Sequence, residues 1–328
     1  MICAKMRRHR ALGVIAASLI LFASQAGGQQ PVHRIGVLAN MRLPETMQAW
    51  LGGLRERGYV EGQSLQIEYR YWQGRTEQIP ALVAELLAFG PEVIVAATAP
   101  SAVAVHAAAP TIPLVFLNVG DPIAIGLVES LAHPGGNVTG FATLVPEGFV
   151  GKQLQFLKDL VPRPSRIAVL INPVTSTHQQ ELPKLPETGR LLGAELIVVE
   201  ASKPDQLETA FETAHTQGAE AIHVWGDPLV FTLSAKVVGL AARYRLPAMY
   251  LERRYVLEGG LMCYGPRLED NWGGAASYVD KILKGERPGD LPVQQPTRYY
   301  LVVNLKTAAE LGIMVPPSIL AQADEVIE

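Results

Sequence analysis

Polar, acidic and aromatic side chains follow many of the apolar runs in this sequence, and they are the residues best suited to hold a small molecule. Amide, hydroxyl and carboxylate groups bind the polar and charged parts of a ligand, and aromatic rings stack on its apolar part. In chain order these candidates are Asn40, Thr98, Ala99, Pro100, Ser101, Asn118, Asp121, Asn172, Trp225, Asp227, Tyr250 and Glu252. Their types predict a ligand-binding site.

The run from Thr98 to Ser101 leads from an apolar segment into a helical pattern. Free backbone N–H groups and the dipole at the start of that helix would hold a carboxylate. The structural alternative is that Thr98 or Ser101 simply caps the helix. Both interpretations stay open at this point.

Asp121 and Asp227 are each followed by a proline, which is the form of a helix cap with proline at the first helical position. The functional alternative makes each aspartate an acceptor for a ligand ammonium, with Glu252 as a further candidate. Trp225 and Tyr250 stack on an apolar or aromatic ligand, or they fill space between two domains.

Motifs for covalent, redox and metal chemistry are missing from the sequence. No G-x-G-x-x-G follows the first strand pattern, no G-x-S-x-G is present, and the seven histidines have no metal-ligand spacing. His223 lies inside a strand pattern and is interpreted as structural. Cys263 lies in an apolar run and is interpreted as a small buried hydrophobe. We therefore expect no enzyme, no cofactor and no metal site.

The N-terminus has the pattern of a cleavable signal peptide. Basic residues at positions 5, 7, 8 and 10 precede an uncharged stretch over residues 11–22, and Ser24-Gln25-Ala26 provides small residues for cleavage after Ala26. A membrane anchor is the alternative, but the apolar run is short for a span. No cysteine stands at the cleavage point, so we expect a periplasmic protein without a lipid anchor.

Charge argues against several partners. The chain has 28 basic and 31 acidic residues, and four of the basic ones fall in the signal segment. The remaining surface is acidic, which argues against nucleic acid and against an anionic membrane surface.

Strand and helix patterns alternate along the chain. Helical apolar spacing separates the predicted strands, and a helix is predicted over residues 101–108. Strands are predicted over residues 33–38, 65–71, 93–97, 113–117, 137–141, 167–171, 196–199, 221–224 and 247–250. Such alternation predicts an α/β fold with two doubly wound, Rossmann-like parallel sheets.

The two halves echo one another. Residues 34–40 (RIGVLAN) are echoed by 166–172 (RIAVLIN), and Gly120-Asp121-Pro122 is echoed by residues 226–228. Ligands of open α/β sheets bind beyond the carboxyl ends of the strands. The candidate residues above therefore line one cleft if the two domains face each other through these edges.

Five stretches of the sequence resemble the ABC transporter substrate-binding family that includes tryptophan- and tyrosine-associated binding proteins. The likeness runs from about His33 to the C-terminus. The stretches are residues 53–62 (GLRERGYVEG), 113–122 (PLVFLNVGDP), 134–140 (PGGNVTG), 278–285 (YVDKILKG) and 291–297 (LPVQQPT) with 304–308 (NLKTA).

This resemblance implies a type I periplasmic-binding-protein architecture whose chain crosses between lobes three times. The crossings fall near residues 140–146, 263–266 and 294–297, a helix over 271–283 returns to the first lobe, and 299–304 form a strand of the second. The first lobe is then residues 31–142 plus 265–295, and the second is 143–264 plus 296–328, after a signal peptide over 1–26. Tyr264, at the second crossing, joins the candidate ligand contacts on this ground alone.

The family also implies an ABC permease and its ATPase as partners of a monomeric protein. The expected function is to bind a small solute by hinge closure without changing it chemically. An amino acid with an aromatic or branched side chain suits the candidate residues; a nucleoside, a small carboxylic acid or a short peptide also fits. A sensory binding protein that docks to a receptor, and an exported enzyme on the same fold, are the alternatives.

Overall fold

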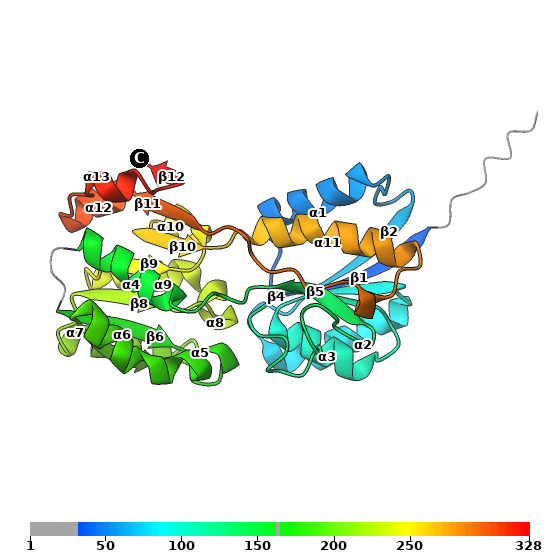
Figure 1. The fold of residues 1–328 in the computed structure, drawn as a ribbon, viewed down its shortest axis with the longest axis horizontal. Helices are drawn as coiled ribbons and strands as arrows, with labels where there is room; N and C mark the ends of the chain where they lie inside the picture. Colours follow the sequence, from blue (N-terminus) through cyan, green and yellow to red (C-terminus); the bar gives the residue numbers. More distant parts are fainter. Residues whose placement is uncertain (1–31, 162–164) are drawn as a thin grey trace, which may run out of the picture. The chain divides into compact units, whose positions relative to one another are not determined.

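The strands of this protein gather into two β-sheets (Figure 1). The structure, a computed structural model, describes residues 32–161 and 165–328, so the expected signal peptide lies outside the described residues. Residues from Val32 onward group into one unit. Within the described ranges, no helix has the length and apolar character needed to cross a membrane.

The first sheet has five parallel strands in the order β2-β1-β3-β4-β5. The strand bounds are β1 His33–Ala39, β2 Leu65–Tyr71, β3 Val93–Ala97, β4 Leu114–Val119 and β5 Val138–Ala142. Successive strand residues point to opposite faces. Val93 and Val95 of β3 therefore join one apolar cluster, whereas Ile94 and Ala96 join another on the opposite face.

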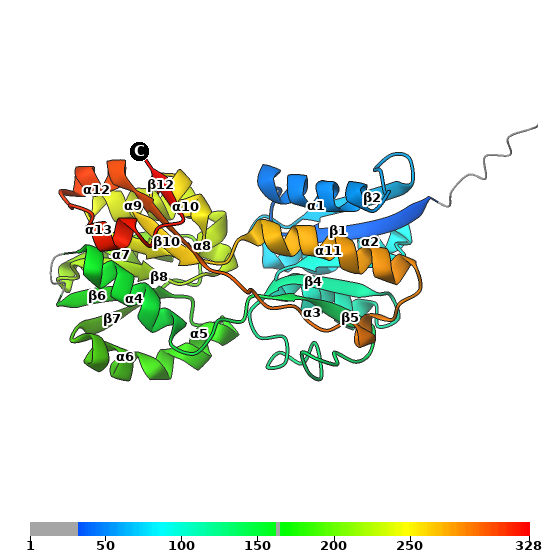
Figure 2. The ribbon, with the colours of Figure 1, turned by 45° about the horizontal axis from the view of Figure 1, so that its top comes forward.

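Two helices cover each face of this sheet. α1 (Pro44–Glu56) and α11 (Leu268–Leu283) pack on one face, and α2 (Ile79–Phe89) and α3 (Ala99–Ala108) pack on the other. α1 and α11 lie side by side although they are far apart in the sequence (Figure 1 and Figure 2). A Cβ added at Gly53 would lie 2.9 Å from the Cβ of Ala276, so glycine permits this close approach. We call this sheet and its four helices the first lobe.

The second sheet has seven strands in the order β12-β11-β10-β9-β8-β6-β7. Neighbouring strands pair in parallel except β10 and β11, which are antiparallel. The strand bounds are β6 Arg166–Ile171, β7 Glu195–Glu200, β8 Ala221–Val224, β9 Ala248–Tyr250, β10 Met262–Gly265, β11 Tyr300–Asn304 and β12 Glu325–Ile327.

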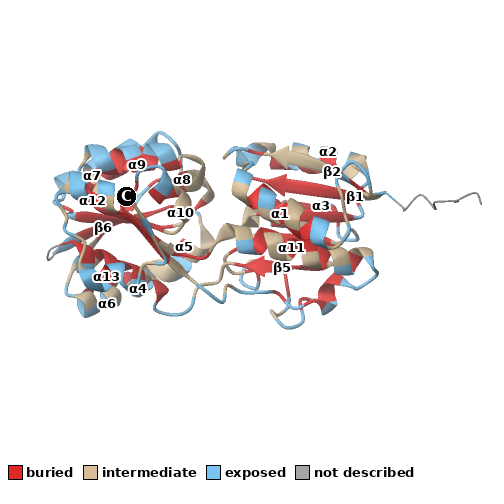
Figure 3. Cartoon of the chain, turned by 90° about the horizontal axis from the view of Figure 1, so that it is seen from above, coloured by how far each residue is buried: buried red, intermediate tan, exposed pale blue. Residues whose placement is uncertain are grey.

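Helices also cover both faces of the second sheet, and its central strands are buried (Figure 3). One face carries α7 (Gln206–Thr216), α9 (Ser234–Arg243) and α10 (Arg253–Leu257). The other carries α4 (Phe149–Leu160), α12 (Leu305–Leu311), α13 (Pro317–Leu320) and, beside β6, α6 (Leu185–Leu192). Two short helices, α5 (Ser176–Glu181) and α8 (Pro228–Thr232), follow the carboxyl ends of β6 and β8. We call this sheet and its helices the second lobe.

The predicted fold class is confirmed, with two differences in detail. The pair β10–β11 runs antiparallel, so the second sheet is not wholly parallel. No helix is capped by Asp121, because residues 122–126 form consecutive turns. Asp121 Oδ1 accepts hydrogen bonds from the backbone N–H groups of Ile123 and Ala124 at 3.1 and 3.0 Å, which holds the chain in those turns.

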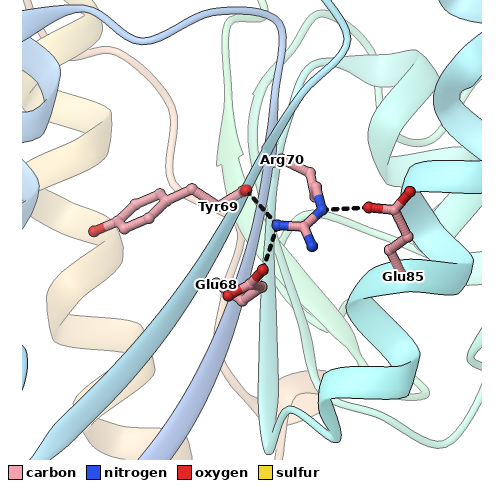
Figure 4. A network of polar contacts seen from close by, with 4 residues as sticks. All are labelled: Glu68, Tyr69, Arg70 and Glu85. Carbon is pink, nitrogen blue, oxygen red and sulfur yellow. Dashed lines mark hydrogen bonds and ion pairs between the residues drawn. The ribbon is translucent and has the colours of Figure 1, made fainter.

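Arg70 ties the edge strand β2 to helix α2 (Figure 4). Its Nε donates to Oε2 of Glu85 at 2.6 Å, and its Nη1 donates to Glu68 and to the backbone oxygen of Tyr69. These side chains are partly exposed, and ion pairs in such positions typically contribute about 0.2–1 kcal/mol. The network therefore orients an edge strand and adds little to the core.

Gly140 of β5 is expected to tolerate no side chain. A Cβ at this position would lie 2.1 Å from the backbone oxygen of Phe116 on the paired strand β4, and the strand would have to move. Gly140→Ala should lower the free energy of unfolding by about 3 kcal/mol, the upper part of the range for overpacking. Urea denaturation measures this loss. Gly52→Ala is the control, since nothing lies within 4 Å of its Cβ in α1 and alanine favours a helix; a Gly140→Ala variant as stable as Gly52→Ala would contradict the steric argument.

Candidate functional site

Two neighbouring cavities are lined by loops at the carboxyl ends of strands in both lobes. The smaller has a volume of about 150 Å³, and its polar lining includes Asn40, Asn118, Asp227 and Glu252. The larger, of about 980 Å³, is lined by aromatic residues that include Phe149 and Trp225. Thr98, Asn118 and Asp227 line both, so we call the two cavities together the cleft. Its total size suits a small organic solute.

Two carboxylates line the small cavity. Asp227 precedes α8 as its N-cap, where Oδ1 accepts from the backbone N–H of Leu229 at 2.8 Å and Oδ2 accepts from the hydroxyl of Thr175 at 2.5 Å. Glu252 precedes α10, and its Oε2 is buried without a hydrogen-bond partner among the described residues. A buried carboxylate oxygen without a partner is costly unless something binds to it.

Burial, with a smaller contribution from the negative charge of Asp227, raises the pKa of Glu252 to about 8. The lost hydration penalises the ionised form of the carboxyl group, and a second carboxylate nearby adds repulsion. Perturbed carboxyl groups in a cavity are typical of functional sites. This pair is therefore equipped to receive a cationic group.

On the side of the second lobe, the large cavity is lined by residues whose polar atoms hydrogen-bond to one another in a chain; we call the lining on this side the wall. Trp225 Nε1 donates to His223 Nδ1 at 3.2 Å, His223 Nε2 donates to Gln153 Oε1 at 3.0 Å, and Gln153 Nε2 donates to the backbone oxygen of Tyr264 at 2.7 Å. Burial lowers the pKa of His223 to about 3, so its ring is neutral. Because these polar atoms bond to one another, the wall offers the cleft mainly apolar faces.

His178, which also lines the large cavity, is held by hydrogen bonds to the backbone. Its Nδ1 accepts from the backbone N–H of Asn172 and its Nε2 donates to the backbone oxygen of Gly226, each at 3.0 Å. Burial lowers its pKa, so this ring too is neutral. The His178 and Trp225 rings meet edge to face at 5.2 Å, which fixes the indole at the end of β8.

The start of α3 is held from within the first lobe. Thr98 has a φ of 131° and its side chain makes no capping bond; its hydroxyl donates to Ser101 Oγ at 3.1 Å. Trp72 Nε1 also donates to Ser101 Oγ, at 3.0 Å. Thr98 thus faces both cavities and leaves the helix start uncapped by its side chain, whereas Ser101 is engaged in the core.

Asn40 joins the two lobes at the small cavity. Its Oδ1 accepts from the backbone N–H of Gly74 at 2.8 Å, and its Nδ2 donates to Oγ1 of Thr232 in the second lobe at 2.7 Å. Thr232 in turn donates to the backbone oxygen of Pro228 at 2.7 Å. The amide of Asn40 therefore makes an interlobe contact in this structure.

Most of the predicted site residues line the cleft, and three do not. Those that line it are Asn40, Thr98, Ala99, Pro100, Asn118, Asp121, Asn172, Trp225, Asp227 and Glu252. Ser101, Tyr250 and Tyr264 line neither cavity. Tyr250 is fully buried and stacks on Tyr255 of α10 at 4.6 Å, because the last residue of β9 points to the face that α7, α9 and α10 cover. Tyr264 packs instead against Phe149 at 5.3 Å.

Several lining residues were not among the predicted ones. Gln153 carried a usable signal, because it lies on the apolar stripe of α4 between Val150 and Leu154, where a polar residue needs a partner. Phe231 and Trp272 also line the small cavity, yet both fall within ordinary helical patterns that gave no sign of it. Among the described residues, no group of three or more potential metal ligands is found.

The chain is similar to known proteins over most of its length. The chain is 23% identical over 315 residues to the tyrosine-binding protein of Clostridioides difficile strain R20291, an alignment that covers 92% of this chain and 90% of that protein. A Streptococcus pneumoniae ABC domain solved in complex with L-Trp has a TM-score of 0.81 at 25% identity, and a conserved domain protein of Vibrio cholerae has 0.83 at 28%. Each comparison covers 90% of this chain and 99% of the other.

A family model matches nearly the whole described chain, over residues 36–327. The model describes ABC transporter substrate binding proteins. The chain belongs to the ABC transporter substrate-binding protein family.

Proposed function

We propose that this protein is the extracytoplasmic solute-binding component of an ABC importer and that it holds an aromatic amino acid in the cleft. The observation that carries the proposal is that Glu252 lines the small cavity together with Asp227 and has a buried Oε2 without a hydrogen-bond partner among the described residues. A ligand ammonium would bind there. The uncapped start of α3 at Thr98 would receive the carboxylate, and the apolar wall at Trp225 and Phe149 would receive the side chain.

The relatives support this solute class. One is named a tyrosine-binding protein, and another was solved with L-Trp. Both similarities extend over most of this chain. No bond of the solute changes in the proposed cycle, and an ABC permease with its ATPase would receive it.

Closure about a three-part hinge is the proposed motion. The lobes would then be residues 31–142 with 265–295, and residues 143–264 with 296–328, in a monomer freed of residues 1–26 in the periplasm. The ends of β5 at Ala142 and of β10 at Gly265 support the first two boundaries, and the bridge between Phe141 and Gln294 supports the third. A ligand favours closure only through contacts that it makes better in the closed state.

Isothermal titration and thermal unfolding test the solute assignment. Protein beginning at Gly27 is titrated with tyrosine, tryptophan, phenylalanine, leucine, glutamate and a nucleoside. At a hundredfold excess over Kd, a bound solute stabilises the native state by roughly 2.7 kcal/mol. Binding of an aromatic amino acid that Glu252→Ala abolishes supports the proposal. Folded protein that binds glutamate or the nucleoside in preference to every aromatic amino acid contradicts it.

The contact between Asn40 and Thr232 leads to a prediction about closure. Thr232→Val keeps the side-chain shape and removes the acceptor for Asn40, so the closed state should lose about 1 kcal/mol. Affinity should then fall about fivefold for every solute alike, mainly through faster dissociation, which stopped-flow fluorescence measures. Thr216→Val, on the exposed end of α7, is the control. A loss confined to one solute would instead indicate that Thr232 contacts the ligand.

A further inference from the structure

The charged groups around the cleft are strongly unbalanced. The small cavity is lined by Asp227 and Glu252 and, among the described residues, by no lysine, arginine or histidine. The large cavity adds Glu77, Asp121 and Glu181 but only Lys203 as a permanent cation, since His178 and His223 are neutral. Such a cleft attracts cations and repels anions.

Three nearby arginines do not offset this imbalance. They border a narrow pocket of about 30 Å³ next to Glu252. Arg253 forms a bidentate pair with Glu325 at 2.5 and 2.6 Å, and Arg254 pairs with Glu258 at 2.8 Å. Arg267 lies over the ring of Tyr300 at 4.0 Å. Arg253 and Arg254 thus have carboxylate partners of their own, and Arg267 Nε is buried without a hydrogen-bond partner in the described part of the chain. None of the three arginines lines the small cavity, where the carboxyl group of Glu252 is left for a ligand.

The carboxylate of an amino acid gains less from this site than its ammonium group does. An ammonium meets the carboxylate of Asp227 and the carboxyl group of Glu252, whose Oε2 has no hydrogen-bond partner among the described residues. A carboxylate meets the start of α3, where such interactions are worth about 0.3–1 kcal/mol near a surface, and it enters a field dominated by acidic groups. An arylalkyl amine has the ammonium group and the ring of the amino acid. It lacks the carboxylate, which the acidic groups of the cleft repel.

We propose that the cleft binds aromatic primary amines that lack a carboxylate, such as tyramine and tryptamine, with a Kd no more than threefold above that of the corresponding amino acid. The amine binds at Glu252 and Asp227, and its ring lies against the wall that includes Phe149 and Trp225. This assignment rests on the proposed solute-binding function and widens its substrate class from amino acids to organic cations.

The binding should also release a proton. Glu252 is mainly protonated at neutral pH and must ionise to pair with an ammonium group, so the affinity for tyramine should rise from pH 6 to pH 8 and then level off. The groups that face Glu252 or border its pockets are Asp227, Arg254, Tyr255, Cys263, Glu45, Arg253, Arg267 and Glu269. Glu252→Gln should remove the pH dependence and weaken tyramine binding at least tenfold at pH 8.

Paired calorimetric titrations test the proposal. Tyramine is compared with tyrosine, tryptamine with tryptophan, and N-acetyltyramine serves as the uncharged control. An amine Kd no more than threefold above that of its amino acid, together with loss of binding on acetylation, supports the inference. An amine Kd more than threefold weaker overturns it.

The two proposals fail in different ways. Binding of tyrosine with amines more than threefold weaker would keep the amino-acid function and overturn the wider class. Binding of tyramine without tyrosine would keep the wider class and overturn the amino-acid function. Binding of neither by folded protein would overturn both. Glu200→Gln, at the exposed end of β7, is the matched variant, since it removes one carboxylate outside both cavities.

Discussion

The Glu252→Gln variant without ligand is expected to be more stable than the parent at pH 8, by a free energy of unfolding on the order of 4 kcal/mol. Burial raises the pKa of Glu252 from its ordinary value of 4.5 to about 8 in the folded protein. The unfolded chain therefore ionises this carboxyl group over a pH range in which the folded protein keeps it protonated. Glutamine has the same shape and does not ionise in either state.

The sign of this effect depends on pH. Below about pH 4.5 the carboxyl group of Glu252 is protonated in both states, so parent and variant should be nearly equally stable. As the pH rises towards 8, the parent loses stability relative to the variant, and above pH 8 the difference stays constant. Urea denaturation at pH 5 and pH 8 measures the two gaps. Glu200→Gln, at the exposed end of β7, should show no comparable change; an equal gap at both pH values would refute the linkage.

Replacing Trp272 with alanine should lower the free energy of unfolding by about 3–5 kcal/mol and also weaken ligand binding. Trp272 on α11 is 3% exposed and meets Trp50 of α1 edge to face, with ring centroids 6.2 Å apart. It also lines the small cavity, which Trp50 does not. The indole of Trp272 is therefore both part of the core of the first lobe and part of the floor of the site.

Trp50→Ala separates these two roles. Both variants lose one member of the same aromatic pair and should lose similar stability by calorimetry. The Kd for tyrosine, measured at a temperature where both variants are folded, should rise at least tenfold only for Trp272→Ala. An equal rise in both would show that the binding loss follows from core damage alone. Trp272→Phe keeps an aromatic floor if the alanine variant does not fold.

The local sequence predicted the bounds of the strands well, but it did not predict the direction in which neighbouring strands pair. Apolar runs bounded by turn residues identified strands such as β2, β3 and β8 at their observed bounds. The same pattern says nothing about direction, because buried side chains alternate equally in parallel and antiparallel strands. β11 lies antiparallel to β10 since the chain returns to the second sheet from α11 of the first lobe, and this long-range route has no local signature.

The site could be predicted to the level of loops but not of side-chain direction. The rule that ligands lie beyond the carboxyl ends of strands identified the end of β4 at Asn118 and the loop that holds Trp225 and Asp227. It could not distinguish Trp225, which lines the cleft, from Tyr250, which stacks on Tyr255 in the core. Nor could it show that Glu252 lacks a partner, because a missing hydrogen bond depends on every neighbour in space.

Segments from the last part of the chain complete both hydrophobic cores. The first lobe needs α11 beside α1, and the second needs β11 and β12 at the edge of its sheet. A chain that emerges amino end first from a ribosome or a translocation pore can therefore finish neither core until residues beyond Leu268 are available. Contacts between such distant segments form slowly. Both lobes must then complete their folding only after nearly the whole chain has emerged. Until then the unfolded chain is exposed to proteases and chaperones.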